Sequence, residues 1–440
     1  MHTAQPRTET PSMPAPMPRS LWAHIARPAP ATEAASGEGR ADVVIIGAGY
    51  LGLSAAIHLA EGGRRVVVLE ASQIGWGASG RNGGQVIPGL KIDPDEVEAL
   101  LGPARGRRLV TWAGAAPALV FDMIARHRIA CDCVQNGWIQ PAYSAAAMQI
   151  VESRCRQWKD RGARVRMLDP AEIGPMLGTD RYVGGWLDER GGSINPLSYS
   201  RGLAEAAISA GVSIFTATPV TNVVREGGGW KVAAPSATFI CDKVVVATGA
   251  YGNLLSDLNR SIIPVRIGEV ATEPLSEELA GRILPGRQVA SDWRRLLTSF
   301  RITPDGRLMM GGSTATSAPE HDGIRRSLHR AARDLFGHLG EFPWSFFWSG
   351  VFAVTKDKLP HLHEPSLGFV AAAGCNGRGI AVSTAIGKMI AEYLQGRDAG
   401  DLELPFTGIV PRRFHAMFRP GMRIAIGWKG VQDRVDRLLT

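Results

Sequence analysis

Near the start of the chain, hydrophobic runs and a glycine turn follow one another in the order strand, helix, strand. An apolar run at 43–46 leads into the turn GAGYLG at 47–52, and small and apolar residues continue to residue 60. A second apolar run, 66–69, ends at Glu70. This order, with GxGxxG spacing and a terminal acid, is typical of a dinucleotide-binding unit.

The residue types at the turn fit contact with a nucleotide. Gly47 would allow a tight turn, Gly49 would let backbone N–H groups approach a pyrophosphate, and Gly52 would let the helix pack close to the strand. The positive end of the helix dipole favours phosphate at this position. Glu70 is placed to accept hydrogen bonds from a ribose. The alternative, a glycine turn without a nucleotide, leaves the terminal acid unexplained.

Further hydrophobic patterns extend this unit. Apolar residues spaced three to four apart predict helices at 95–128 and 144–161, and a third helix at 203–210 ends at Gly211. The continuous apolar run 244–249 is typical of a strand in a parallel sheet that is covered on both faces. The other predicted strands are 212–216, 221–225, 230–233, 262–267, 296–302 and 307–312.

The hydrophobic patterns near the two ends of the chain predict how the chain divides into domains. An apolar run at 368–373, glycines within 374–379 and a helical stretch at 381–394 form a second strand–glycine–helix unit. We expect this unit to share one sheet with residues 43–46. The later strands of the middle region would then form a different sheet in an inserted domain, and a substrate would bind in the cleft between the domains.

Composition narrows the class of protein. With 440 residues, of which 20% are charged, the chain has room for two or three domains of ordinary soluble composition. The net charge of +8 is spread without a dense basic run, so we expect a basic surface and no nucleic-acid site. No apolar stretch approaches the roughly 18 residues of a membrane span, and no signal peptide is visible, so we expect no transmembrane segment.

The cysteines suggest neither disulfides nor a metal site. Five cysteines in a long chain is an odd number that fits a reducing cytoplasm. Cys131 and Cys133 follow His127, but no second ligand pair follows at zinc spacing. We therefore expect no metal.

Residues 74–85, IGWGASGRNGGQ, carry a resemblance to a known family. The segment resembles the one that follows the ribose acid in FAD-dependent amine and amino-acid oxidoreductases, the superfamily of D-amino-acid oxidase, glycine oxidase and sarcosine oxidase. Within this superfamily the chain is most similar to the gamma-glutamylputrescine oxidase branch. Shorter similar segments at 20–22, 137–140, 182–186, 296–301, 358–361 and 374–379 extend the resemblance over about residues 20–396.

The resemblance implies an α/β fold, in which a Rossmann-like FAD-binding domain carries an inserted α+β substrate domain, as in D-amino-acid oxidase. We expect a disordered tail and N-terminal arm at 1–40, a discontinuous FAD-binding domain at 41–92, 190–260 and 350–397, a substrate domain at 93–189 and 261–349, and a C-terminal extension at 398–440.

FAD, not NAD, is the implied cofactor. We expect it to be non-covalent, because Asn82 stands where some members carry a linking histidine. The glycine turn would contact the pyrophosphate, Val220 the adenine, and the second glycine segment the flavin pyrimidine. The implied cofactor-binding residues are Gly47, Gly49, Tyr50, Leu51, Gly52, Glu70, Ala71, Ala78, Ser79, Gly80, Arg81, Asn82, Gly83, Gly84, Gln85, Val220, Thr248, Gly249, Gly374, Asn376, Gly377, Arg378, Gly379 and Ile380.

The resemblance further implies oxidation of an amine to an imine, which hydrolyses to an aldehyde, with O₂ or another acceptor reoxidising the flavin. In sarcosine-oxidase-type members a lysine above the flavin promotes reaction with oxygen, and by rough alignment its position falls near Met309 in this sequence. Gly89 and Ala381 fall where those members hold the substrate carboxylate with basic residues. We therefore expect a longer amine, such as a gamma-glutamylputrescine-like polyamine derivative, and a role in polyamine catabolism.

Three residues are candidates for substrate contact. Arg301 could meet a distal carboxylate, Trp348 could form a pocket wall, and His361 could lie near the flavin; a structural role is the alternative for each. Two other functions stay open: oxidation of a secondary or cyclic amino acid of sarcosine, glycine or pipecolate type, and a flavin-binding subunit that relays electrons. The expected partners are a small-molecule amine and O₂ or another acceptor, in the cytoplasm.

Overall fold

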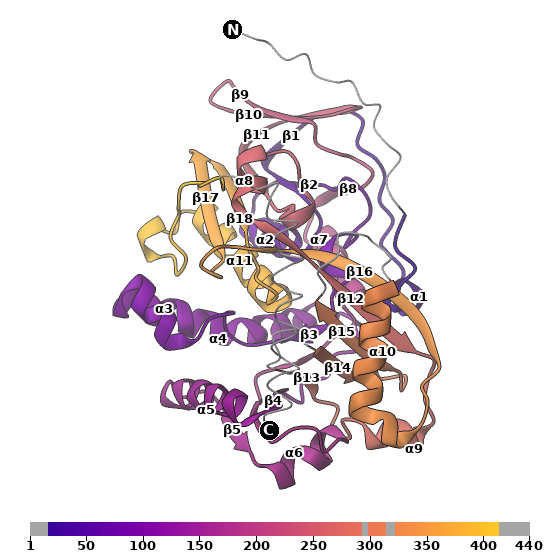
Figure 1. Ribbon diagram of the computed structural model, residues 1–440. Coiled ribbons are helices and arrows are strands. Elements are labelled where there is room, and N and C mark those ends of the chain that lie inside the picture. The colour runs from indigo at the N-terminus through magenta and orange to yellow at the C-terminus, as the bar shows by residue number, and fades with distance from the viewer. Residues whose placement is uncertain (1–15, 293–297, 314–321, 413–440) are drawn as a thin grey trace.

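The computed structural model describes residues 16–292, 298–313 and 322–412 (Figure 1). The strands of this part of the chain form two eight-stranded sheets and a ribbon of β3 (Gln85–Val86) and β7 (Gly192–Ser193). The predicted tail up to residue 15 and the predicted C-terminal extension beyond residue 412 lie outside the described residues.

The first sheet has the order β17-β18-β11-β1-β2-β8, and β10 and β9 are added beside β11. Its strands are β1 (Gly37–Ile46), β2 (Val66–Leu69), β8 (Ser213–Phe215), β9 (Asn222–Glu226), β10 (Gly229–Ala234), β11 (Ala237–Val246), β17 (His361–Ser366) and β18 (Phe369–Ala373). β1 pairs in parallel with β2 and β11, and β11 pairs in parallel with β18. The prediction that 43–46 and 368–373 share a sheet is confirmed.

Helices cover one face of the central strands of this sheet. α2 (Tyr50–Glu61), which follows the glycine turn, packs against α11 (Gly379–Leu394) and α7 (Pro196–Ser209). Gly387 allows α11 to approach α2, since a Cβ there would lie 2.5 Å from the carbonyl oxygen of Leu51. All four residues of β2 are buried, as expected for a parallel sheet covered on both faces.

The second sheet has the order β16-β12-β15-β14-β13-β4-β6-β5. Its strands are β4 (Trp138–Ala142), β5 (Val165–Leu168), β6 (Gly184–Asp188), β12 (Ile263–Thr272), β13 (Val289–Ser291), β14 (Thr298–Ile302), β15 (Leu308–Ser313) and β16 (Trp344–Val354). One face packs on α6 (Pro170–Leu177), α9 (Glu277–Arg282) and α10 (Asp322–Phe336). In Figure 1 this layer lies below the first sheet.

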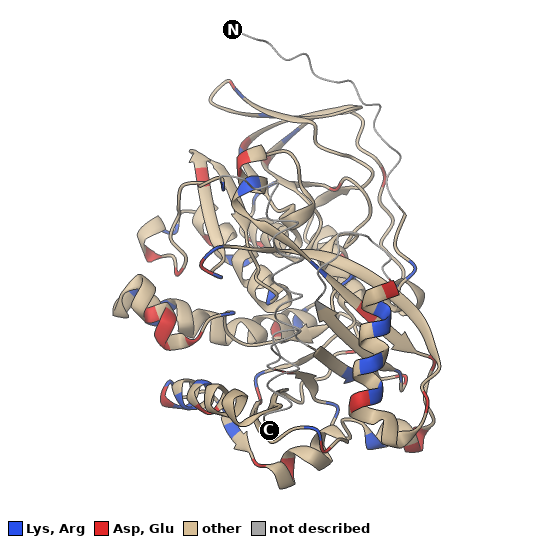
Figure 2. Ribbon diagram, in the orientation of Figure 1, with Lys and Arg blue, Asp and Glu red and all other residues tan. Residues whose placement is uncertain are grey.

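Helix α10 carries charged residues on one face and buried apolar residues on the other. Figure 2 shows basic and acidic residues interspersed along α10, while the strands behind it are mostly uncharged. On its other face, α10 buries Ile324, Leu328 and Leu335. The pattern is that of a solvated amphipathic helix.

Helices α3 (Pro94–Leu101) and α4 (Pro103–Arg126) occupy the predicted helical region 95–128, and α5 (Ala145–Asp160) occupies the next one. Within the described residues, α4 is the one helix long and apolar enough to cross a membrane by length and composition. Half of its apolar window is buried inside the protein, with Leu109 and Val120 enclosed, and the helix packs against α11. These contacts are typical of a core helix.

We propose the expected division of the chain into domains with its boundaries moved out of three elements. The expected boundary at residue 40 falls inside β1, which begins at Gly37, and the one at residue 260 falls inside α8 (Ser256–Ser261), so we place them before Gly37 and after Ser261. β16 pairs with β12 from Trp344 to Val354. The expected boundary at residue 350 therefore falls inside a strand of the second sheet, and we place it after Val354.

Candidate functional site

A cavity of about 1080 Å³ lies where the two sheets meet. It is lined by Gly47 and Glu70 near the ends of β1 and β2, by Thr248 after β11, by Gly377 before α11 and by Val265 of the second sheet. This is the edge of a parallel sheet at which ligands bind in nucleotide-binding folds. Of the predicted cofactor residues, four lie outside the lining: Gly52, Gly80, Arg81 and Gly84.

The glycine turn has the conformation that its predicted roles require. Gly47 has φ of +111°, and a Cβ there would lie 2.8 Å from the Ala247 carbonyl oxygen. A Cβ at Gly52 would lie only 2.0 Å from the Gly47 carbonyl oxygen. Gly52 thus shapes the turn from behind the cavity, without lining it.

Glu70 lies at the end of β2 and lines the cavity. Its carboxylate accepts hydrogen bonds from the backbone N–H groups of Ala48, at 2.8 Å, and Ser72, at 2.9 Å. Burial raises the pKa of Glu70, and these two bonds oppose that rise. Each carboxylate oxygen keeps a lone pair for a further donor such as a ribose hydroxyl.

Glu70→Gln should weaken FAD binding. The amide NH₂ replaces one of the two acceptor oxygens, so one backbone N–H loses its partner and one ribose contact weakens. We expect a loss of about 1–3 kcal/mol, roughly 5- to 150-fold in affinity. Titration of the apoprotein with FAD measures this. Glu38→Gln, an exposed exchange on β1, is the control, and equal affinity in both variants would contradict the role of Glu70.

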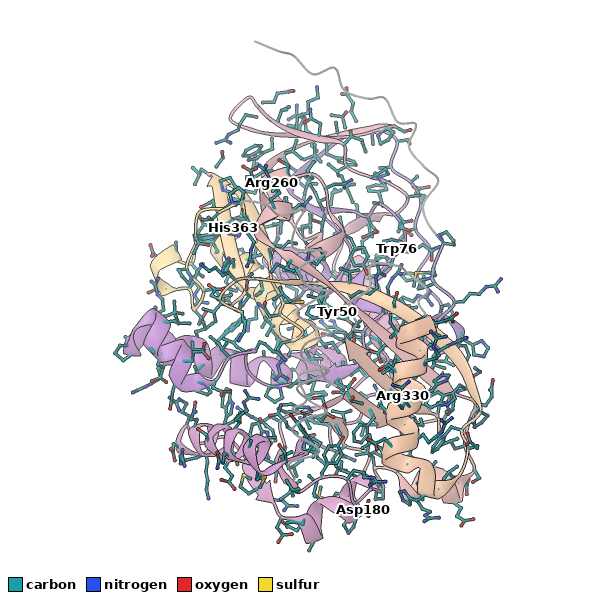
Figure 3. All side chains as sticks on the ribbon, in the orientation of Figure 1. Tyr50, Trp76, Asp180, Arg260, Arg330 and His363 are labelled. Atoms are coloured by element: carbon teal, nitrogen blue, oxygen red, sulfur yellow. The ribbon has the colours of Figure 1, made fainter. Side chains whose placement is uncertain are left out.

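The segment from η1 (Ala78–Gly80) to Gln85 is held by Asn82. Its Nδ2 donates to the carbonyl oxygens of Ala78 and Ser79, each at 3.0 Å, and its Oδ1 accepts from the Gly84 N–H at 2.9 Å. Tyr50, near the centre of the molecule (Figure 3), donates from its hydroxyl to the Ser79 carbonyl oxygen. The segment therefore lines the cavity in a fixed conformation.

Arg81 does not line this cavity. Its guanidinium lies 4.4 Å from the ring centre of Trp76, and its Nε donates to the Trp76 carbonyl oxygen at 2.8 Å. Burial lowers the pKa of Arg81. The expected contact of this side chain with the cofactor is not supported, because the cation–π contact and the hydrogen bond hold it behind the wall.

The second glycine segment completes the lining. Asn376, at φ of +51°, accepts a hydrogen bond from the Thr355 N–H at 2.9 Å through its Oδ1. Arg378 lies 4.8 Å from the ring centre of Trp138, and burial lowers its pKa to about 9. Its Nε has no hydrogen-bond partner within the described part of the chain. Arg378 is therefore a buried cation with a donor that is free to bind a ligand.

The three predicted substrate contacts do not line the cavity. Arg301 is 1% exposed and donates from Nη1 to the carbonyl oxygens of Gly84, at 3.2 Å, and Ile194, at 2.8 Å. Trp348 donates to the Arg81 carbonyl oxygen at 2.9 Å. His361 pairs with Asp357 at 3.0 Å. Each side chain is engaged by protein groups, so a positioning or structural role replaces the expected contact.

The second sheet contributes a wall that the sequence did not indicate. Val265, Ile267 and Glu269 alternate along β12 and line the cavity. Ser291 of β13 and Ser299 of β14 lie in the same wall. The signal in the sequence was one acid, Glu269, in a mostly apolar strand that also carries Arg266, and the face that the acid occupies depends on tertiary packing.

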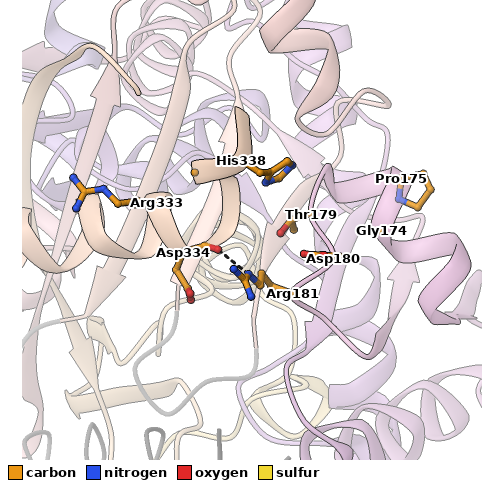
Figure 4. Close-up of a pocket in the computed structure, with 9 residues that line it drawn as sticks. Gly174, Pro175, Thr179, Asp180, Arg181, Arg333, Asp334 and His338 are labelled. Carbon is orange, nitrogen blue, oxygen red and sulfur yellow. Dashed lines mark hydrogen bonds between the residues drawn. The ribbon is translucent and has the colours of Figure 1, made fainter. Parts of the chain in front are cut away.

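A second hollow, of about 810 Å³, opens between the end of α6 and α10 (Figure 4). The Nε of Arg181 donates to the Asp334 carbonyl oxygen at 3.1 Å across it. Asp180, Arg181 and Arg333 are exposed there. None of the predicted site residues lines this hollow.

Comparison with known proteins decides the family. A family model described as "FAD dependent oxidoreductase" (DAO) matches residues 42–393. The chain belongs to this DAO family. It is 32% identical to a probable oxidoreductase, OrdL, of Haemophilus influenzae over 365 residues, and 32% identical to gamma-glutamylputrescine oxidoreductase of Escherichia coli over 358 residues. Each match covers 81% of this chain and 84% of the relative.

A solved structure has the same fold as this DAO-family chain. Glycine oxidase from Geobacillus kaustophilus superposes with a TM-score of 0.71 at 23% sequence identity, covering 85% of this chain and 99% of the other. The predicted α/β fold with a Rossmann-like FAD-binding domain is confirmed. The chain is an FAD-dependent oxidoreductase of a family that acts on amines and amino acids.

The residues around the cavity fit FAD. The glycine turn exposes backbone groups to the cavity, and Glu70 can accept further hydrogen bonds. Nε of Arg378 is a buried donor that has no partner among the residues described. We propose that FAD is held without a covalent bond. The Asn82 amide is committed to backbone groups, and burial raises the pKa of the Cys375 thiol, which disfavours the thiolate that a linkage would need.

Proposed function

We propose that this enzyme oxidises the C–N bond of an elongated amine, with gamma-glutamylputrescine as the type of substrate. The products would be an imine, which water converts to an aldehyde and ammonia, and two electrons passed to O₂ or another acceptor. A role in polyamine catabolism and a cytoplasmic location belong to this proposal, and the five free thiols support the location.

One observation carries the proposal: a cavity lined by the predicted FAD residues continues along a wall of the second sheet. When bound, FAD would supply an acceptor for the hydride of the substrate C–H bond. Val265, Ile267 and Phe352 form an apolar part of the wall that would exclude water from the reacting carbon.

The substrate class is supported by two further facts. The relative from Escherichia coli is named gamma-glutamylputrescine oxidoreductase. Gly89 and Ala381, the places where the family resemblance implies a carboxylate clamp, do not line the cavity and carry no charge. A small amino acid would therefore lack the clamp at these places.

Anaerobic and aerobic incubation with a panel of amines tests the proposal. We expect gamma-glutamylputrescine to bleach the flavin faster than sarcosine, glycine or L-pipecolate. Peroxide formed in air would identify an oxidase, and bleaching without peroxide would identify a dehydrogenase. Bleaching by the amino acids alone would instead support amino-acid oxidation, and a flavin that no panel member bleaches would favour an electron-relay subunit.

A further inference from the structure

One row of residues crosses the second sheet on the face that meets the cavity. The strand register places Trp348 of β16 beside Glu269 of β12, Glu269 beside Gly311 of β15, Gly311 beside Ser299 of β14, and Ser299 beside Ser291 of β13. Paired residues of neighbouring strands project to the same face. Glu269, Ser299 and Ser291 all line the cavity.

Glu269 is a buried acid whose side chain fills a space beside two glycines. It is 1% exposed, and its Oε2 has no hydrogen-bond partner among the residues that the structure describes. Two glycines leave the room that it occupies: a Cβ at Gly311 would lie 2.3 Å from Oε2, and one at Gly83 would lie 3.2 Å from Oε1. A buried carboxylate without a donor is costly, so a ligand that brings a donor would offset that cost.

Within the described part of the chain, the charged group that acts on Glu269 is Arg301 of β14. The Nη1 of Arg301 is bonded to the carbonyl oxygens of Gly84 and Ile194. The neighbours that β15, β16 and the 82–84 segment bring to Glu269 are Gly311, Trp348 and Gly83, which carry no charge. Burial raises the pKa of Glu269 to about 8, and Arg301 only partly opposes the rise.

The polar row continues away from Glu269. Ser299 donates to the Gly311 carbonyl oxygen at 3.3 Å. Ser291 accepts a hydrogen bond from Nε1 of Trp138 at 2.7 Å. Gln140 of β4 accepts from Nε1 of Trp186 at 3.1 Å and also lines the cavity. Hydroxyl and amide groups therefore follow one line along a wall that is otherwise largely apolar.

We propose that Glu269 binds the ammonium group of the substrate amine and takes its proton, and that Ser299, Ser291 and Gln140 contact polar groups further along the substrate. The proton moves from the substrate nitrogen to Oε2 of Glu269, which leaves the nitrogen lone pair free and changes no other bond. The substrate class is an aliphatic primary amine with an amide or similar polar group several carbons away. This inference rests on the proposed function.

The test compares wild-type holoenzyme with Glu269→Gln and with Glu278→Gln, an exposed exchange on α9. All three are first shown to contain FAD by their absorbance. With gamma-glutamylputrescine and putrescine as probes, we expect the rate constant of anaerobic flavin bleaching to fall by about 100-fold or more in Glu269→Gln, the range of a lost acid–base group. Glu278→Gln should match wild type. The melting-temperature rise that the amines cause in wild type should be absent in Glu269→Gln.

The pH profile separates a catalytic role from a structural one. Below pH of about 8 Glu269 is protonated and cannot take the proton, so the apparent second-order rate constant for bleaching should rise with pH up to that value. In Glu269→Gln this rise should disappear. Equal rates and equal profiles in wild type and Glu269→Gln would overturn the inference while leaving the proposed function intact. A wild-type flavin that no amine bleaches would overturn the proposed function itself.

Discussion

Gly52→Ala produces a protein that loses most of its FAD during purification. The new Cβ would lie 2.0 Å from the Gly47 carbonyl oxygen and 3.2 Å from Cγ2 of Ile45. The first of these contacts is with backbone, so α2 must move away from β1 and the turn at 47–52 must change shape. Overpacking of this kind costs about 1–3 kcal/mol, which is roughly 5- to 150-fold in FAD affinity if the cost falls on the bound state.

The measurement is the ratio of flavin to protein absorbance, followed by titration of the apoprotein with FAD. Gly281→Ala on α9 is the matched control, because a Cβ there meets nothing within 4 Å. It should retain FAD and gain up to about 1 kcal/mol of stability, as a helical glycine replaced by alanine does. A Gly52→Ala protein with a full complement of FAD would show that the close approach of helix and strand does not shape the site.

Arg301→Met lowers the stability of the enzyme and slows amine oxidation at the same time. Methionine keeps much of the volume but donates no hydrogen bond, so the carbonyl oxygens of Gly84 and Ile194 lose the Nη1 donor. Each unmet buried group costs about 1–3 kcal/mol. The loss of the positive charge also raises the pKa of Glu269 further, because Arg301 is the group that lowers it.

Thermal unfolding in excess FAD and the pH profile of anaerobic bleaching measure the two effects. We expect a lower melting temperature and a profile displaced to higher pH than in wild type. Arg107→Met, an exposed exchange on α4, should change neither property. An Arg301→Met enzyme with a normal melting temperature and a profile like that of wild type would contradict the positioning role of this arginine.

The nucleotide-binding half could be predicted because its signals are local. Runs such as 43–46 and 66–69 are fully apolar because both faces of the sheet are covered, one by helices and the other by a cluster that includes Trp230 and Leu258. The glycine turn also has a sequence pattern of its own. The matching unit at 368–394 has the same signals. Glycine spacing and apolar runs therefore identified strands of one sheet although they lie at opposite ends of the chain.

The substrate wall could not be predicted because tertiary contacts decide it. Arg301 and Ser299 share one face of β14, yet only Ser299 lines the cavity, since Gly84 and Ile194 cover the arginine. Arg81 lies in the glycine-rich segment, but Trp76 holds its side chain outside. β16, which carries Trp348, has no regular alternation of buried and exposed residues and was not expected from its sequence.

Anaerobic titration of the purified holoenzyme with gamma-glutamylputrescine tests the central claim most directly. Flavin absorbance and released ammonia are followed together. We expect the flavin to bleach completely and ammonia to appear in an amount equal to the flavin reduced, since each C–N bond oxidised delivers one electron pair and hydrolyses once. A flavin that dithionite bleaches but the amine does not, with no ammonia released, would contradict the claim.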